Sequence, residues 1–236
     1  MTNRAVLLDL DGTLLDHRRA ADEAVRSWTE TVAADLTGDA AVDQWRRLER
    51  RFFSQFEQGK LSFQEQRRRR VRAFSTSLEN VADAEADALF AQYLALYEAN
   101  WRPYPGARDL IEQALRDSWR VAVLTNGEDS QQRRKLALIG LNHPLVSVFS
   151  SSALGFAKPS AQAFLKACAG LNCRPSATVM VGDDYAKDVL GARRAGLSAI
   201  HVAHVPEDRQ HESVASLQEV LDRLSFGLAA ADPSDA

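Results

Sequence analysis

Five short apolar segments, separated by stretches with helical patterning, constrain the fold of this chain most strongly. The first lies in VLLDLDGTLLD, from Val6 to Asp16, and ends directly in carboxylates. Each segment is apolar at successive positions, which is typical of a strand buried on both faces. Because such strands alternate with helical patterns, the sequence predicts an α/β fold with a doubly wound parallel sheet. The predicted strands cover 5–9, 120–126, 144–150, 177–183 and 198–203.

Helical patterns occupy the rest of this predicted α/β domain. Gly140, Gly170 and Gly196 follow three of them, at the position where glycine commonly ends a helix. The predicted helices cover 109–119, 130–139, 160–169, 186–195 and 213–224.

The interval between Asp16 and Trp101 breaks the alternation because it contains no convincing strand. It is too long for a loop, and three apolar stripes in it repeat at helical spacing. Pro103 and Pro105 follow it and stop helical structure. The sequence therefore predicts an inserted all-helical domain at 17–102, an α/β core at 1–16 and 103–227, and a flexible tail at 228–236.

Charge and hydropathy argue against several classes of partner. The formal net charge is −3, whereas a general nucleic-acid-binding protein has an excess of Lys and Arg on one face. The run from Arg67 to Arg70 lies in a predicted helix, so its side chains point around that helix and are expected on a solvated face, with ion pairs to residues such as Glu65. No stretch reaches the roughly 18 apolar residues of a membrane span, and the first residues lack a secretory leader pattern. We expect a cytoplasmic protein without nucleic-acid or membrane partners; the sequence leaves the oligomeric state open.

Unusual polar residues follow four of the predicted strands, where the sites of open α/β sheets lie. They are Asp9 and Asp11 after the first strand, Thr125 and Asn126 after the second, Lys158 after the third, and Asp183, Asp184 and Asp188 after the fourth. Acidic residues at strand ends also form turns and helix caps, and Asp183 or Asp184 could cap the helix that begins near Ala186. The four groups together, in this order, favour a catalytic site.

These four segments resemble the motifs of the haloacid dehalogenase-like hydrolase superfamily, in its phosphatase branch with an inserted helical cap. The segments read DLDGT, LTNG, FAKPSAQAF and VGDDYAKDVLGARRAG. The resemblance extends from Ala5 to about Leu224, with KPSA as a local departure from the KPDP of many relatives. It implies a Rossmann-like core, with the helical domain at 17–102 as the cap.

The resemblance also implies a mechanism for the acidic residues. Mg²⁺, which prefers hard oxygen ligands, would be held by the carboxylates of Asp9 and Asp183 and by the backbone carbonyl of Asp11. Asp9 would attack phosphorus and form an aspartyl-phosphate. Asp11 would protonate the leaving alkoxide and then deprotonate the water that hydrolyses the intermediate. Asp184 and Asp188 would orient metal-bound waters or Lys158 rather than ligate the metal directly.

Three residues are expected to bind the transferring phosphoryl group, and one is expected to bind the rest of the substrate. The Thr125 hydroxyl, the Asn126 N–H and the Lys158 charge would stabilise the phosphoryl oxygens. In this superfamily the cap carries most of the leaving-group recognition. The loop EQGKLSF interrupts the predicted cap helices, and Lys60 or Gln58 in this loop is a candidate contact for the leaving group.

The sequence therefore predicts a magnesium-dependent phosphatase that acts on a small phosphorylated metabolite, such as a sugar phosphate, a nucleoside monophosphate or phosphoglycolate. A haloacid dehalogenase is disfavoured because its chemistry needs neither the Asp11 acid nor magnesium. A phosphosugar mutase shares all four motifs and remains an alternative, as does, more remotely, a non-catalytic interaction protein. His201 and His204 are expected at the rim of the site or on the surface.

Overall fold

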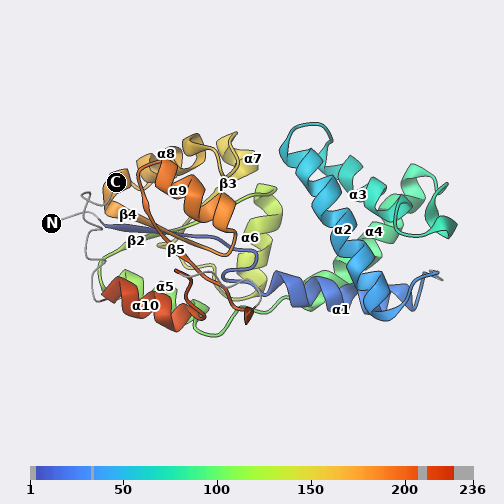
Figure 1. Ribbon diagram of the computed structural model, residues 1–236, viewed down its shortest axis with the longest axis horizontal. Helices are drawn as coiled ribbons and strands as arrows, with labels where there is room; N and C mark the ends of the chain where they lie inside the picture. The colour runs from blue at the N-terminus through green and yellow to red at the C-terminus, as the bar shows by residue number, and fades with distance from the viewer. Residues whose placement is uncertain (1–3, 33–34, 207–211, 226–236) are drawn as a thin grey trace. The chain divides into compact units, whose positions relative to one another are not determined.

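Figure 1 shows the chain in a computed structural model that describes residues 4–32, 35–206 and 212–225. The chain divides into two compact units, one formed by Met1–Asp16 with Pro103–Ala236 and the other by His17–Arg102. The first unit contains the sheet, and the second is helical. The predicted tail at 228–236 lies outside the described residues.

The first unit is built on a sheet of five parallel strands. Their order is β3-β2-β1-β4-β5, so the first strand of the sequence occupies the centre of the sheet. The doubly wound parallel sheet predicted from the apolar segments is confirmed. The strands are β1 (Ala5–Leu8), β2 (Arg120–Thr125), β3 (Ser147–Ser150), β4 (Thr178–Gly182) and β5 (Ser198–His201).

Alternate residues of β1 face opposite sides of the sheet, and both sides are buried. Leu7 is in register with Ala122 of β2 and Met180 of β4, and all three belong to one apolar cluster. Val6 and Leu8 point to the other side and are also fully buried. The strand is therefore apolar throughout because neither of its faces meets water. In Figure 1, α8 (Ala161–Gly170) and α9 (Gly191–Arg194) lie on one side of the sheet, with α5 (Ala107–Arg116) and α10 (Leu217–Ser225) on the other.

The bounds of α5 and α10 are shifted from the predicted 109–119 and 213–224, and two other helices of this unit differ from prediction in their form or in how they end. The segment predicted as one helix at 186–195 is a π-helical turn, η3 (Tyr185–Leu190), that continues into α9. Gly170 is the last residue of α8, and Asn172 instead adopts the left-handed conformation, with φ 50°. A side chain at Gly170 would collide with the Phe149 ring, whose Cζ lies 2.6 Å from the Cβ position. The remaining helices in the described residues of this unit are α6 (Asp129–Leu138), α7 (Ser151–Leu154) and the 3₁₀ turn η2 (Pro175–Ala177).

The described residues of the second unit form helices joined by turns. An aromatic cluster fills its core: the Trp45 ring lies 5.1 Å from the Trp28 ring and 4.6 Å from the Tyr93 ring, measured between centroids. These rings come from three different helices, so the cluster ties the unit together. Within the described parts of the chain, no helix combines the length and the apolar character that a membrane crossing needs. The helices of this unit are α1 (His17–Thr29), α2 (Gly38–Glu57), α3 (Phe63–Arg72), η1 (Thr76–Leu78) and α4 (Asp83–Ala99).

The arginine run on α3 is only partly solvated. Arg69 is exposed and pairs with Glu65 at 2.8 Å, as expected from the sequence. Arg70 is buried instead: its guanidinium lies 3.0 Å from a Glu49 carboxylate oxygen and 4.5 Å from the centroid of the Trp45 ring. Because successive helical residues point about 100° apart, four adjacent arginines cannot all face water. The expectation of a solvated face is therefore wrong for Arg70.

We expect Arg70→Met to lower the free energy of unfolding by about 2 kcal/mol, because it removes the guanidinium that faces Glu49. Fully buried pairs lose more, about 3–5 kcal/mol, but the Glu49 side chain is 24% exposed. Urea denaturation followed by circular dichroism measures the change. The control is Arg69→Met in the same run, which we expect to change stability by less than about 0.5 kcal/mol. Equal losses in the two variants would show that the buried position of Arg70 contributes nothing.

Candidate active site

The loop that follows β1 carries the first two aspartates. The main chain stays in the sheet through Asp9, whose N–H donates to the Val181 carbonyl at 2.9 Å. It then turns at Gly12, which has φ 95°. A Cβ atom at Gly12 would lie 2.3 Å from Asp183 Oδ2. The turn therefore requires glycine, both for its left-handed backbone and for its close approach to Asp183.

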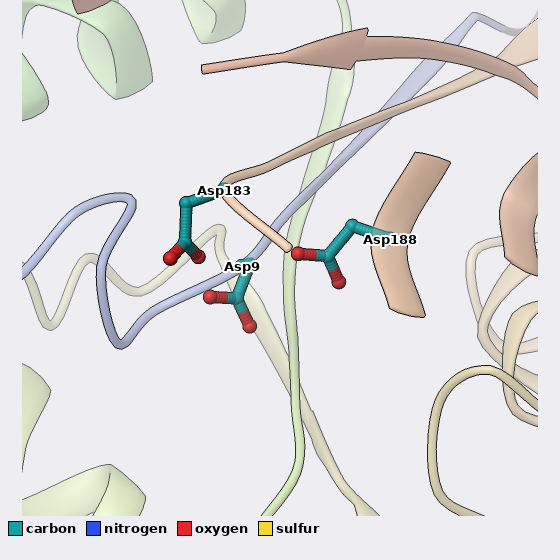
Figure 2. Close-up of side chains that lie close together, drawn as sticks. All are labelled: Asp9, Asp183 and Asp188. Carbon is teal, nitrogen blue, oxygen red and sulfur yellow. The ribbon is translucent and has the colours of Figure 1, made fainter. Parts of the chain in front are cut away.

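Three carboxylates gather at the carboxyl edge of the sheet (Figure 2). Asp9 follows β1, Asp183 follows β4, and Asp188 lies on η3. One carboxylate oxygen from each residue lies within 4.8 Å of the others, close enough for all three to bind one cation. Asp188 packs directly against Gly182, where a Cβ atom would lie 2.1 Å from Asp188 Oδ2.

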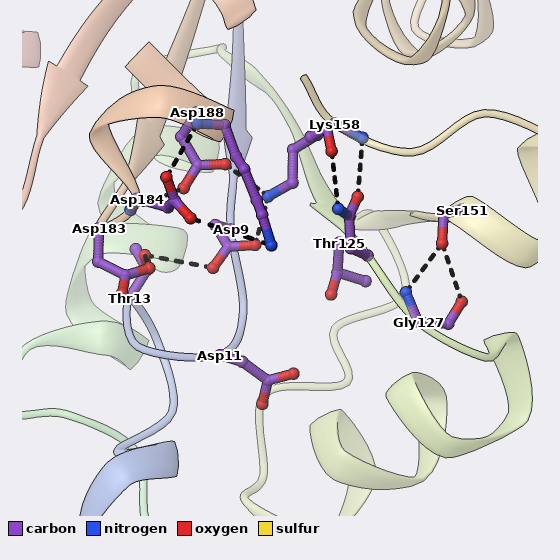
Figure 3. Close-up of polar contacts among 12 residues, drawn as sticks. Asp9, Asp11, Thr13, Thr125, Gly127, Ser151, Lys158, Asp183, Asp184 and Asp188 are labelled. Atoms are coloured by element: carbon purple, nitrogen blue, oxygen red, sulfur yellow. Dashed lines mark hydrogen bonds and ion pairs between the residues drawn. The ribbon is translucent and has the colours of Figure 1, made fainter. Parts of the chain in front are cut away.

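Lys158, in the loop between α7 and α8, reaches into this acidic cluster (Figure 3). Its Nζ atom lies 2.5 Å from Asp9 Oδ1 and 2.7 Å from Asp188 Oδ1, and its side chain is buried. Burial alone disfavours the ammonium form, but the Asp188 and Asp9 carboxylates outweigh it and raise the pKa of Lys158 above its usual range. With all four groups ionised, three carboxylates and one ammonium leave a formal charge of −2 at the edge of the sheet.

Thr125 and Asn126, at the end of β2 and directly after it, make different contacts. Thr125, at the end of β2, is buried, and its Oγ1 accepts a hydrogen bond from Gln132 Nε2 at 3.1 Å. The Asn126 side chain holds the backbone of Lys158: its Oδ1 accepts from the Lys158 N–H at 2.8 Å, and its Nδ2 donates to the Lys158 carbonyl at 2.9 Å. Asn126 therefore positions Lys158 through its side chain, a contact that sequence analysis did not identify.

Asp184 acts as a helix cap. Its Oδ1 accepts a hydrogen bond from the Lys187 N–H at 2.9 Å, at the beginning of η3. Its own N–H donates to Asp188 Oδ2 at 3.2 Å. Helix capping, the alternative role that the sequence left open for Asp183 or Asp184, is the role of Asp184. Asp183 and Asp188 instead contribute oxygens to the carboxylate cluster. Lys60, singled out in the sequence as a candidate contact for the leaving group, lies in the exposed turn between α2 and α3.

Thr13 and two histidines support the loops behind the carboxylates. Thr13 Oγ1 donates to Asp183 Oδ1 at 3.2 Å and is fully buried. His201 is also buried, and its Nε2 donates to the Asp183 carbonyl at 2.8 Å. His204 Nε2 donates to the Thr13 carbonyl at 3.0 Å. The expectation that both histidines lie at the rim or on the surface is therefore wrong for His201, which braces the Asp183 loop from inside.

Asp11 is held by two side chains that the sequence analysis missed. Lys135 Nζ lies 2.6 Å from each of the Asp11 carboxylate oxygens, and Gln132 Nε2 donates to Asp11 Oδ2 at 3.2 Å. Both side chains are on α6 and both are buried. The polar character of SQQRRKLALI, at 130–139, is the signal that could have found them, because a helix packed on a sheet normally turns apolar residues inward.

The pKa values of the clustered carboxyl groups are raised. Burial raises the pKa of Asp183 well above its usual range, and the Asp9 and Asp188 charges add to the shift. Burial also raises the pKa of Asp188, to about 7, although the Lys158 ammonium opposes the shift. Asp9 behaves in the same way, with burial raising its pKa and Lys158 opposing. The site is therefore unfavourable for three simultaneous negative charges unless a further cation is present.

The fold and the site define a class of proteins: a parallel sheet with a carboxylate cluster and a buried lysine at its carboxyl edge. A family model described as haloacid dehalogenase-like hydrolase matches residues 3–196. A glyceraldehyde 3-phosphate phosphatase of Methanothermobacter thermautotrophicus is 30% identical over 206 residues, which cover 84% of this chain and 85% of that protein. The chain belongs to the haloacid dehalogenase-like hydrolase family, as predicted from its four motifs.

Two solved structures illustrate the range of proteins that share this fold. The putative hydrolase YfnB from Bacillus subtilis, in a crystal form bound to magnesium, superposes with a TM-score of 0.74 at 27% identity, covering 94% of this chain and 98% of that one. The defluorinating L-2-haloacid dehalogenase Rha0230 has the same TM-score at 19% identity, covering 94% of this chain and 95% of that one. The second likeness concerns the fold alone.

We expect Asp183→Asn to stabilise the metal-free protein at pH 8. A carboxyl group whose pKa is raised by folding destabilises the folded state above its unfolded pKa, and the penalty is complete once the pH exceeds the folded pKa. The amide removes this penalty, so the thermal midpoint in excess chelator is expected to rise by about 2–4 °C for each kcal/mol gained.

The gain from Asp183→Asn is expected to shrink as the pH falls from 8 to 5, because the native carboxyl group then takes up a proton. Asp184→Asn is the matched control: Asp184 is the next residue in the chain, its side chain caps η3, and asparagine also caps helices. No gain is expected from it. A loss of stability in Asp183→Asn at pH 8 would contradict the unfavourable charge at this position.

Proposed function

We propose that this chain is a magnesium-dependent phosphatase that hydrolyses a small phosphomonoester through an aspartyl-phosphate on Asp9. The observation that carries the proposal is the cluster of Asp9, Asp183 and Asp188, in which Lys158 contacts Asp9. A second carboxylate, Asp11, lies two residues after Asp9 in the chain and is held separately by Lys135. The family match supports hydrolysis, and the similarity to a named phosphatase supports a phosphoryl substrate. Dehalogenation is disfavoured because carbon–halogen cleavage has no use for the acid at Asp11.

The residues fit a magnesium ion. The cluster offers hard carboxylate oxygens that lie close enough together to bind one cation. With Lys158 counted, the cluster has a formal charge of −2, which one divalent cation would neutralise. We assign the ligands to Asp9, Asp183 and the backbone carbonyl of Asp11, with Asp188 close enough to orient a bound water or Lys158. When bound, magnesium would offset the negative charge of the phosphate and allow a carboxylate to approach it.

In the first step the Asp9 carboxylate attacks phosphorus. A bond forms between an Asp9 oxygen and phosphorus, and the bond from phosphorus to the leaving oxygen breaks. Asp11, in its acid form, donates its proton to that leaving oxygen. The Lys158 charge, the Thr125 hydroxyl and the Asn126 N–H stabilise the oxygens of the transferring group. The products of this step are the free alcohol and an aspartyl-phosphate.

In the second step Asp11 acts as a base. It takes a proton from a water molecule, whose oxygen attacks phosphorus and displaces the Asp9 carboxylate. The step releases inorganic phosphate and restores Asp9, with Asp11 again carrying the proton that it donates in the next cycle. One carboxylate thus serves both steps, which requires its position to be fixed relative to Asp9.

The substrate class we infer is a small phosphorylated metabolite of the sugar phosphate, nucleotide or phosphoglycolate type. Glyceraldehyde 3-phosphate, named for the relative from M. thermautotrophicus, is a sugar phosphate of this size. Lys60 remains our candidate for a contact with the leaving group. A phosphosugar mutase is the second candidate function, and it would be distinguished by a requirement for a bisphosphate activator and by the absence of net phosphate release.

Hydrolysis of p-nitrophenyl phosphate is expected to require Mg²⁺ and to vanish in excess chelator, because the three clustered carboxylates repel a phosphate dianion unless a cation is bound. Release of p-nitrophenolate measures the rate. Restoration of activity by added Mg²⁺ is the control for irreversible damage. Undiminished turnover in chelator would exclude the metal from the mechanism.

Asp9→Asn is expected to abolish the aspartyl-phosphate, because it removes the nucleophile. Asp11→Asn is expected to allow phosphorylation by p-nitrophenyl phosphate, whose leaving group needs no proton, and to slow the hydrolysis of the intermediate by a factor of about 10² to 10⁴. Mass spectrometry of acid-quenched protein detects the phosphoryl group.

The matched control for these two variants is Asp117→Asn, which changes an aspartate at the end of α5 that hydrogen bonds with Gln113. We expect it to retain wild-type turnover. Wild-type turnover in Asp9→Asn would show that the proposed nucleophile is wrong.

A further inference from the structure

The contacts around Asp11 suggest a role for helix α6 in the chemistry. We propose that Lys135 and Gln132 are positioning residues that fix the Asp11 carboxylate for its two proton transfers, and that Gln132 couples this carboxylate to Thr125. The inference rests on the acid and base role proposed above for Asp11. It assigns to α6 a function that none of the four sequence motifs contains.

The contact between Lys135 and Asp11 fixes the orientation of the carboxylate as well as its place. The distances from Nζ to the two carboxylate oxygens are equal, 2.6 Å each, so the ammonium contacts both oxygens alike. Rotation of the carboxylate about its last torsion would lengthen both of these contacts, so the ammonium holds the group in this orientation. The Lys135 side chain is 6% exposed and the Asp11 side chain 24%, so water competes weakly for the ammonium.

Gln132 joins the loop after β1 to the end of β2. Its Nε2 atom lies 3.2 Å from Asp11 Oδ2, 3.1 Å from Thr125 Oγ1 and 3.2 Å from the Asn126 carbonyl oxygen. One amide group therefore contacts the proposed acid, a proposed phosphoryl-binding hydroxyl and the backbone beside it. A displacement of either strand end would change the distance between the group that moves the proton and the group that holds the phosphoryl oxygens.

The glycine of the LTNG segment makes room for this amide. A Cβ atom at Gly127 would lie 2.4 Å from Gln132 Nε2 and 3.1 Å from its Cδ. The main chain after β2 is therefore in direct contact with the Gln132 side chain. A residue larger than glycine at 127 would collide with the Gln132 side chain in this position.

The Asp11 carboxylate is not one of the three that cluster at the sheet edge. In Figure 3 the Asp11 side chain is directed away from Asp183 and Asp188. The carboxylate oxygens that cluster tightly are those of Asp9, Asp183 and Asp188, while Asp11 meets its own ammonium. The two lysines thus contact different carboxylates, because Lys158 faces the proposed nucleophile Asp9 and Lys135 faces the proposed proton-transfer residue Asp11.

The test is a double-mutant cycle between Lys135→Met and Asp11→Asn. With glyceraldehyde 3-phosphate, whose alkoxide leaving group needs a proton, we expect Lys135→Met to lower kcat by a factor of about 10 to 100, a fraction of the full acid–base contribution. In the Asp11→Asn background the same substitution is expected to change kcat by less than about twofold, because the group it positions is already lost. The pre-steady-state burst of p-nitrophenolate is expected to stay within about twofold of wild type, because that leaving group needs no acid.

Three further variants make the outcome specific. Lys135→Arg keeps the charge and is expected to recover most of kcat, and Gln132→Leu is expected to show the same dependence on Asp11 as Lys135→Met. Arg133→Met is the matched control on the same helix, since Arg133 pairs with Asp129 and is 56% exposed, and no loss of kcat is expected from it. Equal losses of kcat in the wild-type and Asp11→Asn backgrounds would overturn the positioning role.

A second measurement separates this inference from the proposed function. Because Lys135 and Asp11 are in contact, the shifts in thermal midpoint caused by Lys135→Met and Asp11→Asn are expected to be non-additive, whatever reaction the protein catalyses. Additive shifts would overturn the inference even in a protein that proves to be a phosphatase. Non-additive shifts in a protein that turns over no phosphomonoester would retain the contact and overturn the catalytic role of both residues, together with the proposed function.

Discussion

The ammonium of Lys158, held between Asp9 and Asp188, is the interaction on which the rest of the site depends. Parallel strands end at the same edge of a sheet, so carboxylates that follow β1 and β4 are forced close together in a partly dry environment. Burial and mutual repulsion raise the pKa values of Asp9, Asp183 and Asp188. Lys158 offsets part of this repulsion, and Asn126 fixes the backbone from which Lys158 reaches in. A cluster of this charge is a poor contributor to stability and a good site for a divalent cation.

Close backbone approaches set the geometry of the cluster. Gly12 lets the loop after β1 pass against Asp183, and Gly182 lets Asp188 lie against the end of β4. The π-helical turn η3 carries Asp188, and such turns are frequent at functional sites because they alter which side chains face inward. Behind these loops, Thr13 and His201 bind Asp183 from two directions. The carboxylates are therefore placed by packed backbone and buried hydrogen bonds, not by their own charge.

The two carboxylates of the loop after β1 have separate lysine partners. Asp9 contacts Lys158, which lies in the loop between α7 and α8. Asp11 contacts Lys135, which lies on α6. The division is consistent with a two-step mechanism in which one carboxylate forms a bond to phosphorus and the other only moves protons. The helical unit has a different organisation, with an aromatic core around Trp45 into which Arg70 is folded. A charged residue in that core is stabilised by Glu49 and by the faces of the rings.

The sequence by itself determined the parallel sheet, because strands buried on both faces must be apolar at every position, as β1 is at Val6, Leu7 and Leu8. It also identified the residues at the strand ends, because Asp9, Lys158 and Asp183 belong to short motifs that occur in a fixed order. The tertiary structure alone decided which polar side chains support them. Lys135 and Gln132 lie on a helix with a weak apolar pattern, which does not indicate the residues they contact. The sequence likewise places His201 and Arg70 on the surface, although both are buried. The physical reason is that a contact such as the one between Lys135 and Asp11 joins residues 124 positions apart, and no local pattern records which distant carboxylate a buried ammonium will meet.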